Sequence, residues 1–442
     1  MQIAAQIIFA LILLFAIGLF WRNMKKLNRN IRLGRKNWPN NNPGERWKKV
    51  VLNALGQKKM FKRPIPATLH FFVYAGFIII NIEILEIILD GIFGTHRLFN
   101  PILGNFYAGF INIFEFLALA VLISCVIFLI RRNILKVKRL DMPELNRWPR
   151  MDANIILITE VVLMTAFLMM NGADQVLQSR GSEHYHQTGS LFFSSFLMPL
   201  FNGMSDTSLM AIERGGWWFH ILGVFAFLNY LPFSKHLHII LSFPNTYYAR
   251  TEPQGKMYNM PEIQREVALM LDPNAAVDIP ADASAEPGRF GAKDVYDLQT
   301  TDILGAYSCT ECGRCTASCP ANITGKKLSP RKIMMDTRDR AEEIGRGIDK
   351  NGTDFKDEKS LFGDYITAEE ILACTSCQAC VEACPVNIDP LTIINQLKRY
   401  MIMEEAKSPN SWNVMFGNIE NNQAPWQFSP SDRFKWADEL KE

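Results

Sequence analysis

Residues 309–320 read CTECGRCTASCP and residues 374–385 read CTSCQACVEACP, and this repeated pattern decides how the polar part of the chain folds. Each copy has the spacing C-x2-C-x2-C-x3-C-P, which holds [4Fe–4S] clusters in two-cluster ferredoxins. The three closely spaced thiolates of one copy can surround one cluster, while the fourth cysteine, next to proline, turns away to complete the other. We therefore expect one cluster on Cys309, Cys312, Cys315 and Cys384, and a second on Cys374, Cys377, Cys380 and Cys319.

Two other uses of these cysteines are weaker explanations of the pattern. Zinc is the main alternative, because C-x2-C pairs also build tetrahedral zinc sites. A zinc site, however, needs neither the third C-x2 step nor a fourth cysteine followed by proline. A disulfide framework would not produce two identical dense quartets in a long chain. The pattern therefore predicts an electron carrier.

The long hydrophobic runs of this 442-residue chain are confined to its first 250 residues. Five runs have the roughly 17–25 residues that cross a bilayer as a helix. They lie near residues 3–21, 67–92, 106–130, 153–171 and 217–242. Basic residues and no small-residue cleavage site follow the first run, which favours a retained anchor over a signal peptide. The ninth cysteine, Cys125, lies in the third run and is interpreted as a small packing residue.

The basic residues between these runs predict the orientation of the chain. Residues 22–66 contain fourteen Lys and Arg and one acid, Glu45, and residues 131–152 contain seven basic residues. Basic loops remain on the cytoplasmic side of a membrane. We therefore expect a multi-pass protein of the inner (cytoplasmic) membrane, with its N-terminus outside and the cysteine motifs in the cytoplasm. Nucleic-acid binding by the basic 22–66 loop is a weaker alternative, and no nucleic acid is expected as a partner.

The predicted fold class is all-α, with a five-helix transmembrane domain at 1–250 and an α-helical ferredoxin domain at 301–405. Residues 251–300 lose periodicity and fill with Pro, Ala, Asp and Gly, which predicts an extended linker. The tail at 406–442 is aromatic and irregular, with Trp412, Trp426 and Trp436 among its residues. It is interpreted either as a strap packed over its own domain or as an arm that docks a partner.

Two histidines are predicted to bind a haem within the membrane domain. His70 and His238 lie at the cytoplasmic ends of their predicted spans, at matching depth. Two imidazoles on facing helices are the axial ligands that a b haem requires. We therefore predict a haem between His70 and His238, with His236 as the competing inner ligand.

His220 lies 18 residues before His238. In a continuous helix this separation is five full turns, so the two rings would share one face about 27 Å apart. His220 would then lie near the outer surface, where a second haem would need another axial ligand. The residues that could supply it are His96, His184, His186, Met169 and Met170. The alternative is that His220 hydrogen-bonds a quinone or another helix.

Carboxyl groups also occur within the predicted spans. Glu83, Glu86 and Asp90 are spaced to form one stripe on the second span, and Glu115 and Glu160 lie in the third and fourth. Ionisable residues within a membrane are costly and usually functional. Proton movement beside a quinone and pairing with Arg97 or neighbouring helices explain the stripe equally well.

The stretch GWWFH…YLPFSKHLHI, which contains His220 and His238, resembles the five-span haem b subunit of respiratory nitrate reductase (gamma type). The separation of these two histidines matches the last-helix pair of that family. The family also has two histidines ten residues apart in its second span. His70 fits the inner one, while Ile80 stands at the position of the other. The resemblance therefore implies one haem, with a second possible on that family's pattern.

Residues 290–333 and the second cysteine motif closely resemble iron–sulfur oxidoreductases of the heterodisulfide-reductase-like and membrane electron-transfer-flavoprotein dehydrogenase type. Members of that group usually continue into two cysteine-rich CCG domains, and this sequence has no cysteine after Cys384. The resemblance implies a separate partner, either a CCG-domain iron–sulfur subunit or a flavoprotein such as electron-transfer flavoprotein.

These observations predict a quinone-linked oxidoreductase subunit of a respiratory chain. It would pass electrons between a cytoplasmic partner and the membrane quinone pool through two [4Fe–4S] clusters and a b haem. The sequence has no glycine-rich dinucleotide fingerprint and no nucleophile constellation, so the partner would oxidise the substrate. The alternative is a membrane-anchored iron–sulfur redox sensor or anchor subunit without quinone turnover.

Overall fold

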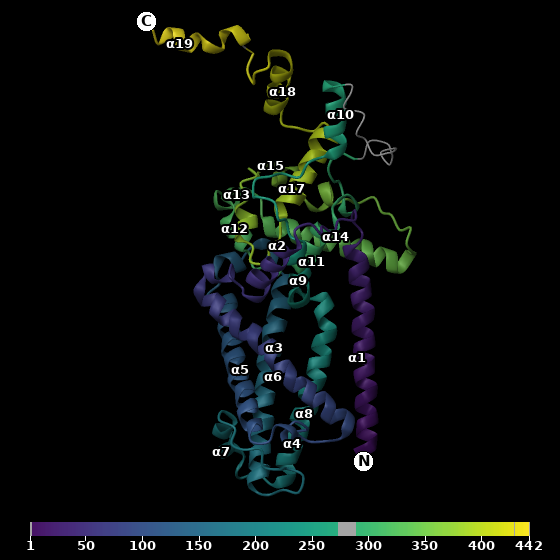
Figure 1. Cartoon of the computed structure of the whole chain (residues 1–442), viewed down its shortest axis with the longest axis vertical. Coiled ribbons are helices and arrows are strands. Elements are labelled where there is room, and N and C mark those ends of the chain that lie inside the picture. The colour runs from purple at the N-terminus through teal and green to yellow at the C-terminus, as the bar shows by residue number, and fades with distance from the viewer. Residues whose placement is uncertain (1, 273–288, 428, 442) are drawn as a thin grey trace.

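The computed structural model describes residues 2–272, 289–427 and 429–441, and these are built from helices. β pairing in these residues is limited to two isolated bridges, Arg35 with Gln299 and Phe362 with Ile366. A bundle of long helices carries a group of shorter helices at one end (Figure 1). We call this end the ferredoxin end and the opposite one the distal end. The all-α prediction is confirmed.

Four helices in the described residues are long and apolar enough to cross a membrane. They are α1 (Gln2–Ile31), α3 (Pro64–Phe93), α5 (Phe106–Leu129) and α6 (Trp148–Ser179). Proline in the first turn of α3 and of α6 is tolerated because the N–H it lacks would have no helical partner there. Gly94 ends α3 with a φ of 69°, a left-handed conformation that favours glycine. These helices cover the first four predicted runs.

The fifth predicted span, 217–242, is wrong in its bounds. Helix α8 (Asp206–Tyr230) begins earlier and ends before Pro232, whose ring prevents the helix from continuing. Two 3-10 turns, Leu231–Phe233 and Lys235–Leu237, follow, and α9 (His238–Tyr248) begins a new helix. His220 and His238 therefore lie on different helices and do not share one helix face.

The bundle is held together by contacts of α6 with α5 and α8 and of α3 with α5. Helix α1 lies along the side of the bundle, where it contacts α3 and α8 (Figure 1). Short helices cap the two ends: α2 (Pro43–Lys49) at the ferredoxin end, and α4 (Asn100–Leu103) and α7 (Met198–Phe201) at the distal end.

The ferredoxin region is helical, as predicted. Its helices are α11 (Thr300–Ser308), α12 (Arg314–Ser318), α13 (Pro320–Ile323), α14 (Pro330–Asn351), α15 (Ala368–Leu372), α16 (Ala379–Ala383) and α17 (Pro390–Arg399). Each cysteine motif forms a loop and then a short helix, α12 in the first copy and α16 in the second. These two helices contact each other, so the two motifs lie side by side.

One hydrophobic core joins the ferredoxin helices to the bundle. Ile303 of α11 belongs to the same buried cluster as Leu27 of α1 and Phe227 of α8. At the edge of this core, Arg29 of α1 binds Asp349 of α14 at 2.5 Å. The ferredoxin region is thereby packed directly against the bundle.

The predicted linker and tail contain helices that composition did not reveal. Helix α10 (Pro261–Leu271) lies within the predicted linker, and residues 273–288 of that segment lie outside the described residues. The tail contains α18 (Asn410–Asn422) and α19 (Lys435–Glu439), which lead away from the ferredoxin helices (Figure 1). The tail is therefore partly helical and does not form a strap over its own domain.

Candidate redox site

The first group of thiols combines three cysteines of the first motif with the last cysteine of the second. Burial, together with the nearby thiols of Cys312 and Cys384, raises the pKa of Cys309 to about 12. Burial followed by the thiols of Cys309, Cys312 and Cys384 also raises the pKa of Cys315. The chain therefore brings together the four residues predicted for one cluster.

The second group of thiols combines three cysteines of the second motif with the last cysteine of the first. Burial raises the pKa of Cys374, and the thiols of Cys319 and Cys377 add to this effect. Burial also raises the pKa of Cys380 to about 12, with contributions from Asp389, Cys374 and Cys319. The last cysteine of the first motif thus lies beside the first three of the second.

The backbone around these thiols fits iron–sulfur clusters. The amide N–H groups of Glu311 and Ser376 point at the sulfurs of Cys309 and Cys374, each at 3.4 Å. Both residues have a positive φ, 55° and 57°, which turns their amides toward the sulfurs. Such N–H···S bonds help to set cluster potentials. Across the described ranges, no three His, Cys, Asp or Glu side chains are grouped closely enough for a single metal ion.

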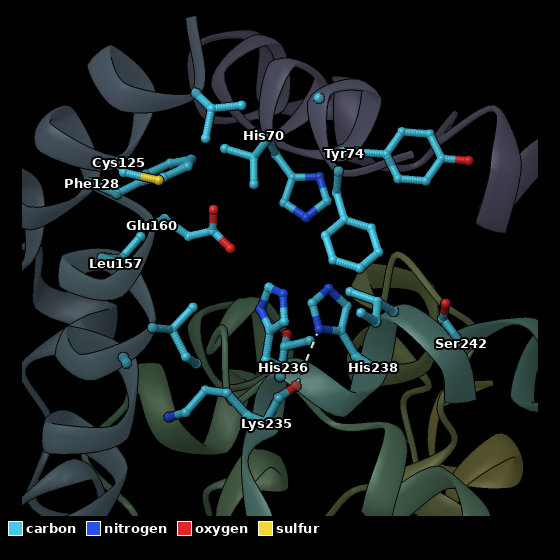
Figure 2. A pocket seen from close by; sticks show the side chains of 18 of the residues that line it. His70, Tyr74, Cys125, Phe128, Leu157, Glu160, Lys235, His236, His238 and Ser242 are labelled. Carbon is cyan, nitrogen blue, oxygen red and sulfur yellow. Dashed lines mark hydrogen bonds between the residues drawn. The ribbon is translucent and has the colours of Figure 1, made fainter. Parts of the chain in front are cut away.

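A cavity of about 510 Å³ extends from the first thiol group into the bundle. Cys312 lines one part of its wall, and four histidines are among the other lining residues: His70, His220, His236 and His238. Figure 2 shows His70 on one side of this space, with His236 and His238 opposite. The fold therefore places the predicted haem ligands next to a predicted cluster.

His70 and His238 have ring centres 6.2 Å apart. Metal–imidazole bonds are about 2 Å long, so two imidazoles that share one metal have ring centres roughly 6 Å apart. The Nδ1 atom of His70 lies 3.1 Å from Gln57 Oε1, and the Nδ1 atom of His238 lies 3.1 Å from the carbonyl oxygen of Lys235. Because these oxygens accept hydrogen bonds, each ring carries its proton on Nδ1 and keeps the Nε2 lone pair for a ligand.

His236 remains the competing inner ligand. Its ring centre lies 5.7 Å from that of His238, and its Nε2 is buried without a hydrogen-bond partner among the described residues. A buried nitrogen without a partner is costly. The Nε2 of His236 therefore also fits an atom of a group bound in the cavity.

A continuous helix predicted that His220 lies near the outer surface, and this prediction is wrong. Its Nδ1 lies 3.2 Å from the carbonyl oxygen of Leu163, about halfway along α6, and its ring lines the same cavity as the other three histidines. The reason is that the polar first half of α8, which carries Glu213 and Arg214, occupies the distal end instead.

None of the predicted second ligands of His220 belongs to the lining of the cavity. Among the residues that line its cavity, the other histidines are the three at the ferredoxin end. His96 lies elsewhere, with its Nε2 3.8 Å from both Asp174 and Glu213. Met170, another predicted candidate, packs close to Gly216.

An ion network joins the first cysteine loop to the bundle. Glu311, between Cys309 and Cys312, binds the ammonium group of Lys235 and, at 3.0 Å, Arg338. Arg139 donates a hydrogen bond to the Cys312 carbonyl oxygen. Burial opposes ionisation of Glu311, but Lys235 and Arg338 outweigh it and lower the pKa of this carboxyl.

Most carboxyls of the predicted spans bind neighbouring backbone amides. Asp90 accepts the amide N–H of Arg97 at 2.9 Å, and Glu86 accepts that of Phe99 at 2.8 Å. Glu115 accepts the amide of Ser194 at 3.1 Å. Structural pairing therefore explains these three groups. Glu83 and Glu160 are not used in this way.

Sequence reasoning missed Gln57, Lys235 and Glu311. Gln57 comes from a loop shortly before the second predicted span, and the fold turns it back to His70, 13 residues later. Glu311 lies inside the first cysteine motif, and its acidic charge next to three thiolates was a signal that it needs a cationic partner. That partner, Lys235, is separated from it by 76 residues.

Comparison with known proteins supports the iron–sulfur region and the membrane attachment. The 4Fe-4S dicluster domain family matches residues 308–388. The chain is 28% identical over 466 residues to the probable iron-sulfur-binding oxidoreductase FadF of Bacillus subtilis, covering 99% of this chain and 61% of that protein. It is 26% identical over 457 residues to the EtfAB:quinone oxidoreductase of Syntrophomonas wolfei, covering 95% and 57%. The chain thus spans about three-fifths of the length of these relatives.

A shorter match is to a probable membrane-anchored ferredoxin of Chromohalobacter salexigens, 29% identical over 170 residues, which covers 34% of this chain and 24% of that protein. No solved structure matches the chain. The chain is therefore a membrane protein with a 4Fe-4S dicluster domain, whose eight motif cysteines support two [4Fe–4S] clusters, and it is related to oxidoreductases.

Proposed function

We propose that this chain passes electrons between a soluble redox partner and a membrane quinone through two [4Fe–4S] clusters and a b haem. The supporting observation is the cavity whose wall contains Cys312, His70 and His238. The haem would be held by the Nε2 atoms of His70 and His238 and would supply one-electron chemistry. The protein would contribute the spacing and the protonation state of the ligands.

The two clusters would follow each other in a defined order. The group that contains Cys377 lies toward the surface, because that cysteine is exposed. Cys312 of the other group lines the cavity. Electrons would therefore pass between the partner and the Cys377 cluster, then the Cys312 cluster, and then the haem.

The partner is proposed to be an electron-transfer flavoprotein. This proposal rests on the relative named EtfAB:quinone oxidoreductase and on the predicted need for a separate two-electron cofactor. A CCG-type iron–sulfur module remains the other predicted partner. Purification in mild detergent is expected to recover one of the two with this chain.

The quinone is proposed to bind near His220. The Nδ1 of His220 faces the Leu163 carbonyl oxygen, so its Nε2 can accept a hydrogen bond from a quinol hydroxyl. His220 as ligand of a second haem is the alternative, which requires an axial ligand from elsewhere.

Helix α8 is proposed as a fifth membrane crossing. It contacts α6 along the bundle and runs between the same two ends (Figure 1). Five crossings place the N-terminus and the ferredoxin region on opposite sides of an inner membrane. The basic loops lie on the ferredoxin side, which is then cytoplasmic.

Spectroscopy of the purified protein tests this function. We expect about eight non-haem irons and eight sulfides per chain, and a dithionite-reduced b-type haem spectrum that quinone reoxidises. His70→Ala and His238→Ala should each abolish the haem spectrum and leave the cluster EPR signals. His184→Ala, outside the cavity lining, is the matched control.

Other results of this experiment would change the assignment. If His236→Ala alone removes the haem, the ligand lies two residues earlier than proposed. A full haem spectrum in both the His70 and His238 variants would contradict the site. A haem that quinone does not reoxidise would favour the sensor or anchor function.

A further inference from the structure

Glu160 is a carboxyl on α6 that faces the cavity. It belongs to the cavity lining, and Figure 2 shows its carboxylate directed into the space between His70 and His236. In the part of the chain that the structure describes, no hydrogen bond or ion pair joins Glu160 to another side chain or to the backbone. A free carboxyl inside a membrane bundle is costly and is retained for function.

Glu160 differs in this respect from the other carboxyls of the bundle. Asp90, Glu86 and Glu115 each accept backbone amides, as described above, and so have a structural role. Glu83 has a buried Oε2 without a partner, but it does not belong to the cavity lining. Glu160 thus combines a free carboxyl with access to the proposed redox group.

The groups that face this carboxyl come from every helix around the cavity. Cys125 of α5 and Tyr74 of α3 lie on its wall, as do the four histidines already described. Five cations line the ferredoxin end of the cavity: Arg131, Arg132, Arg139, Lys235 and Arg314. Lys235 is paired with Glu311 and Arg139 with the Cys312 carbonyl oxygen, while Arg132 has a buried Nη1 without a partner.

We propose that Glu160 takes up one proton when the redox group of the cavity accepts one electron. This inference rests on the proposed function, because it requires a redox group between the histidines. The adjacent cluster is oxidised by one electron and the redox group is reduced by it, while a hydronium ion of the aqueous phase loses one proton, so that one of its O–H bonds breaks and the O–H bond of the carboxyl forms. An added negative charge nearby favours the neutral form of a carboxyl, so the net charge of the cavity remains constant.

The proton would arrive from the ferredoxin end. In that direction the cavity is lined by polar side chains, including Asn53, Gln57 and Arg132. Toward the distal end the wall beyond Glu160 is mainly apolar, with Leu163, Met164 and Ile80, and His220 is a polar side chain beside Leu163. Water reaches the carboxyl more easily along the polar wall, and reduction is therefore coupled to proton uptake from the ferredoxin side.

Redox titration of the full-length protein in detergent tests this proposal. The midpoint potential of the haem is measured between about pH 5 and pH 9, and proton uptake on reduction is measured in weak buffer. The wild-type potential should fall with rising pH by up to about 59 mV per unit, the slope for one proton per electron. Glu160→Gln should flatten this slope and remove about one proton of uptake per chain.

Two further variants keep the test specific. Glu160→Asp retains a carboxyl and should retain proton uptake. Glu83→Gln removes another carboxyl with an unpartnered oxygen, which lies outside the cavity lining, and should leave both measurements unchanged. Iron content and the haem spectrum of each variant confirm that it is folded.

The outcomes separate this inference from the proposed function. A wild-type chain without a haem spectrum contradicts the proposed function and this inference together. A chain with haem whose potential and proton uptake are the same in Glu160→Gln as in the wild type contradicts this inference alone. Equal losses in Glu83→Gln would show a general effect of buried carboxyls and would also overturn it.

Discussion

The side chain that sets the protonation of the His70 ring belongs to Gln57, 13 residues earlier in the chain. Its Oε1 holds the ring proton on Nδ1 and so directs the Nε2 lone pair into the cavity. The Lys235 carbonyl oxygen does the same for His238. The orientation of the two proposed ligand atoms, the Nε2 atoms, is therefore set by hydrogen bonds that the Nδ1 atom of each ring makes.

The first prediction concerns Gln57→Leu, which removes the acceptor behind His70. Loss of such a supporting contact typically weakens metal binding by about 10–100-fold, so the variant should lose haem faster to a haem-binding acceptor protein. Gln175→Leu is the matched control, because Gln175 is a buried glutamine outside the cavity lining. Equal haem loss in the two variants would contradict the role of Gln57.

The second prediction concerns Glu311→Gln. The side chains of Lys235 and Glu311 are only 8% and 3% exposed, so the substitution removes the nearer carboxylate of a buried cation and leaves Asp152, 3.8 Å away, as its remaining acidic partner. Breaking a buried pair typically costs about 3–5 kcal/mol, which should appear as a lower denaturant midpoint for loss of cluster absorbance. Glu369 pairs with Lys327 at the surface, where the two side chains are 63% and 69% exposed. Glu369→Gln should therefore lower the free energy of unfolding by no more than about 1 kcal/mol.

The same pair has a defined pH dependence. Lys235 and Arg338 overcome the opposing effect of burial and lower the pKa of Glu311 below its ordinary 4.5. A lowered pKa contributes stability above the ordinary value, and this stability is lost as the pH falls through the lowered pKa. The difference between wild type and Glu311→Gln should therefore persist at neutral pH and disappear in acid. A difference that grows on acidification would contradict this account.

At the scale of elements, the break between α8 and α9 shapes the site. The turn at Lys235–Leu237 folds back beneath the bundle and brings both His236 and His238 to the cavity. In an unbroken helix, residues two apart point about 160° from each other, roughly two steps of 100°. The hydroxyl of Ser234, which accepts the His236 amide N–H at 3.1 Å, stabilises the turn.

The third prediction concerns the order of the two cluster-binding loops. Cys377 is exposed, whereas Cys309 is 8% exposed. Mild oxidation with a chelator should therefore release iron in two phases, with the Cys377 cluster lost first. The fast phase of iron release, followed by the loss of EPR spins, should be absent in Cys377→Ser and should persist in Cys312→Ser. A single phase in the wild-type protein would contradict the order.

At the scale of the whole molecule, the N-terminus and the ferredoxin region lie at opposite ends of the bundle (Figure 1). The shared core, in which Leu27 of α1 and Ile303 of α11 are buried, holds the two parts in one arrangement. The proposed electron transfer from the cluster to the cavity therefore does not depend on a flexible linker.

The fourth prediction concerns membrane topology. An epitope tag before Met1 should be accessible to protease in intact spheroplasts, and a tag after Glu442 should be protected until the membrane is opened. A tag inserted near residue 182, in a distal loop, is the control and should behave like the N-terminal tag. If both terminal tags were accessible in intact spheroplasts, α8 would not cross the membrane.

The sequence by itself determined the features that depend on short-range spacing. The cysteine pattern predicted both thiol groups, including the exchange of Cys319 and Cys384. Runs of apolar residues predicted α1, α3, α5 and α6, and basic loops predicted His70 and His238 at one depth. These predictions can be made from the sequence because a ligand loop and a spanning helix are each specified by residues close together in the chain.

Only the tertiary structure decided the features that depend on contacts between distant residues. It placed His220 in the same cavity as His70 and paired Lys235 with Glu311 across 76 residues. It also separated Glu160 from the carboxyls that bind backbone amides. A side chain's partners are set by the packing of helices against one another, and that packing is not written in the spacing of any one segment.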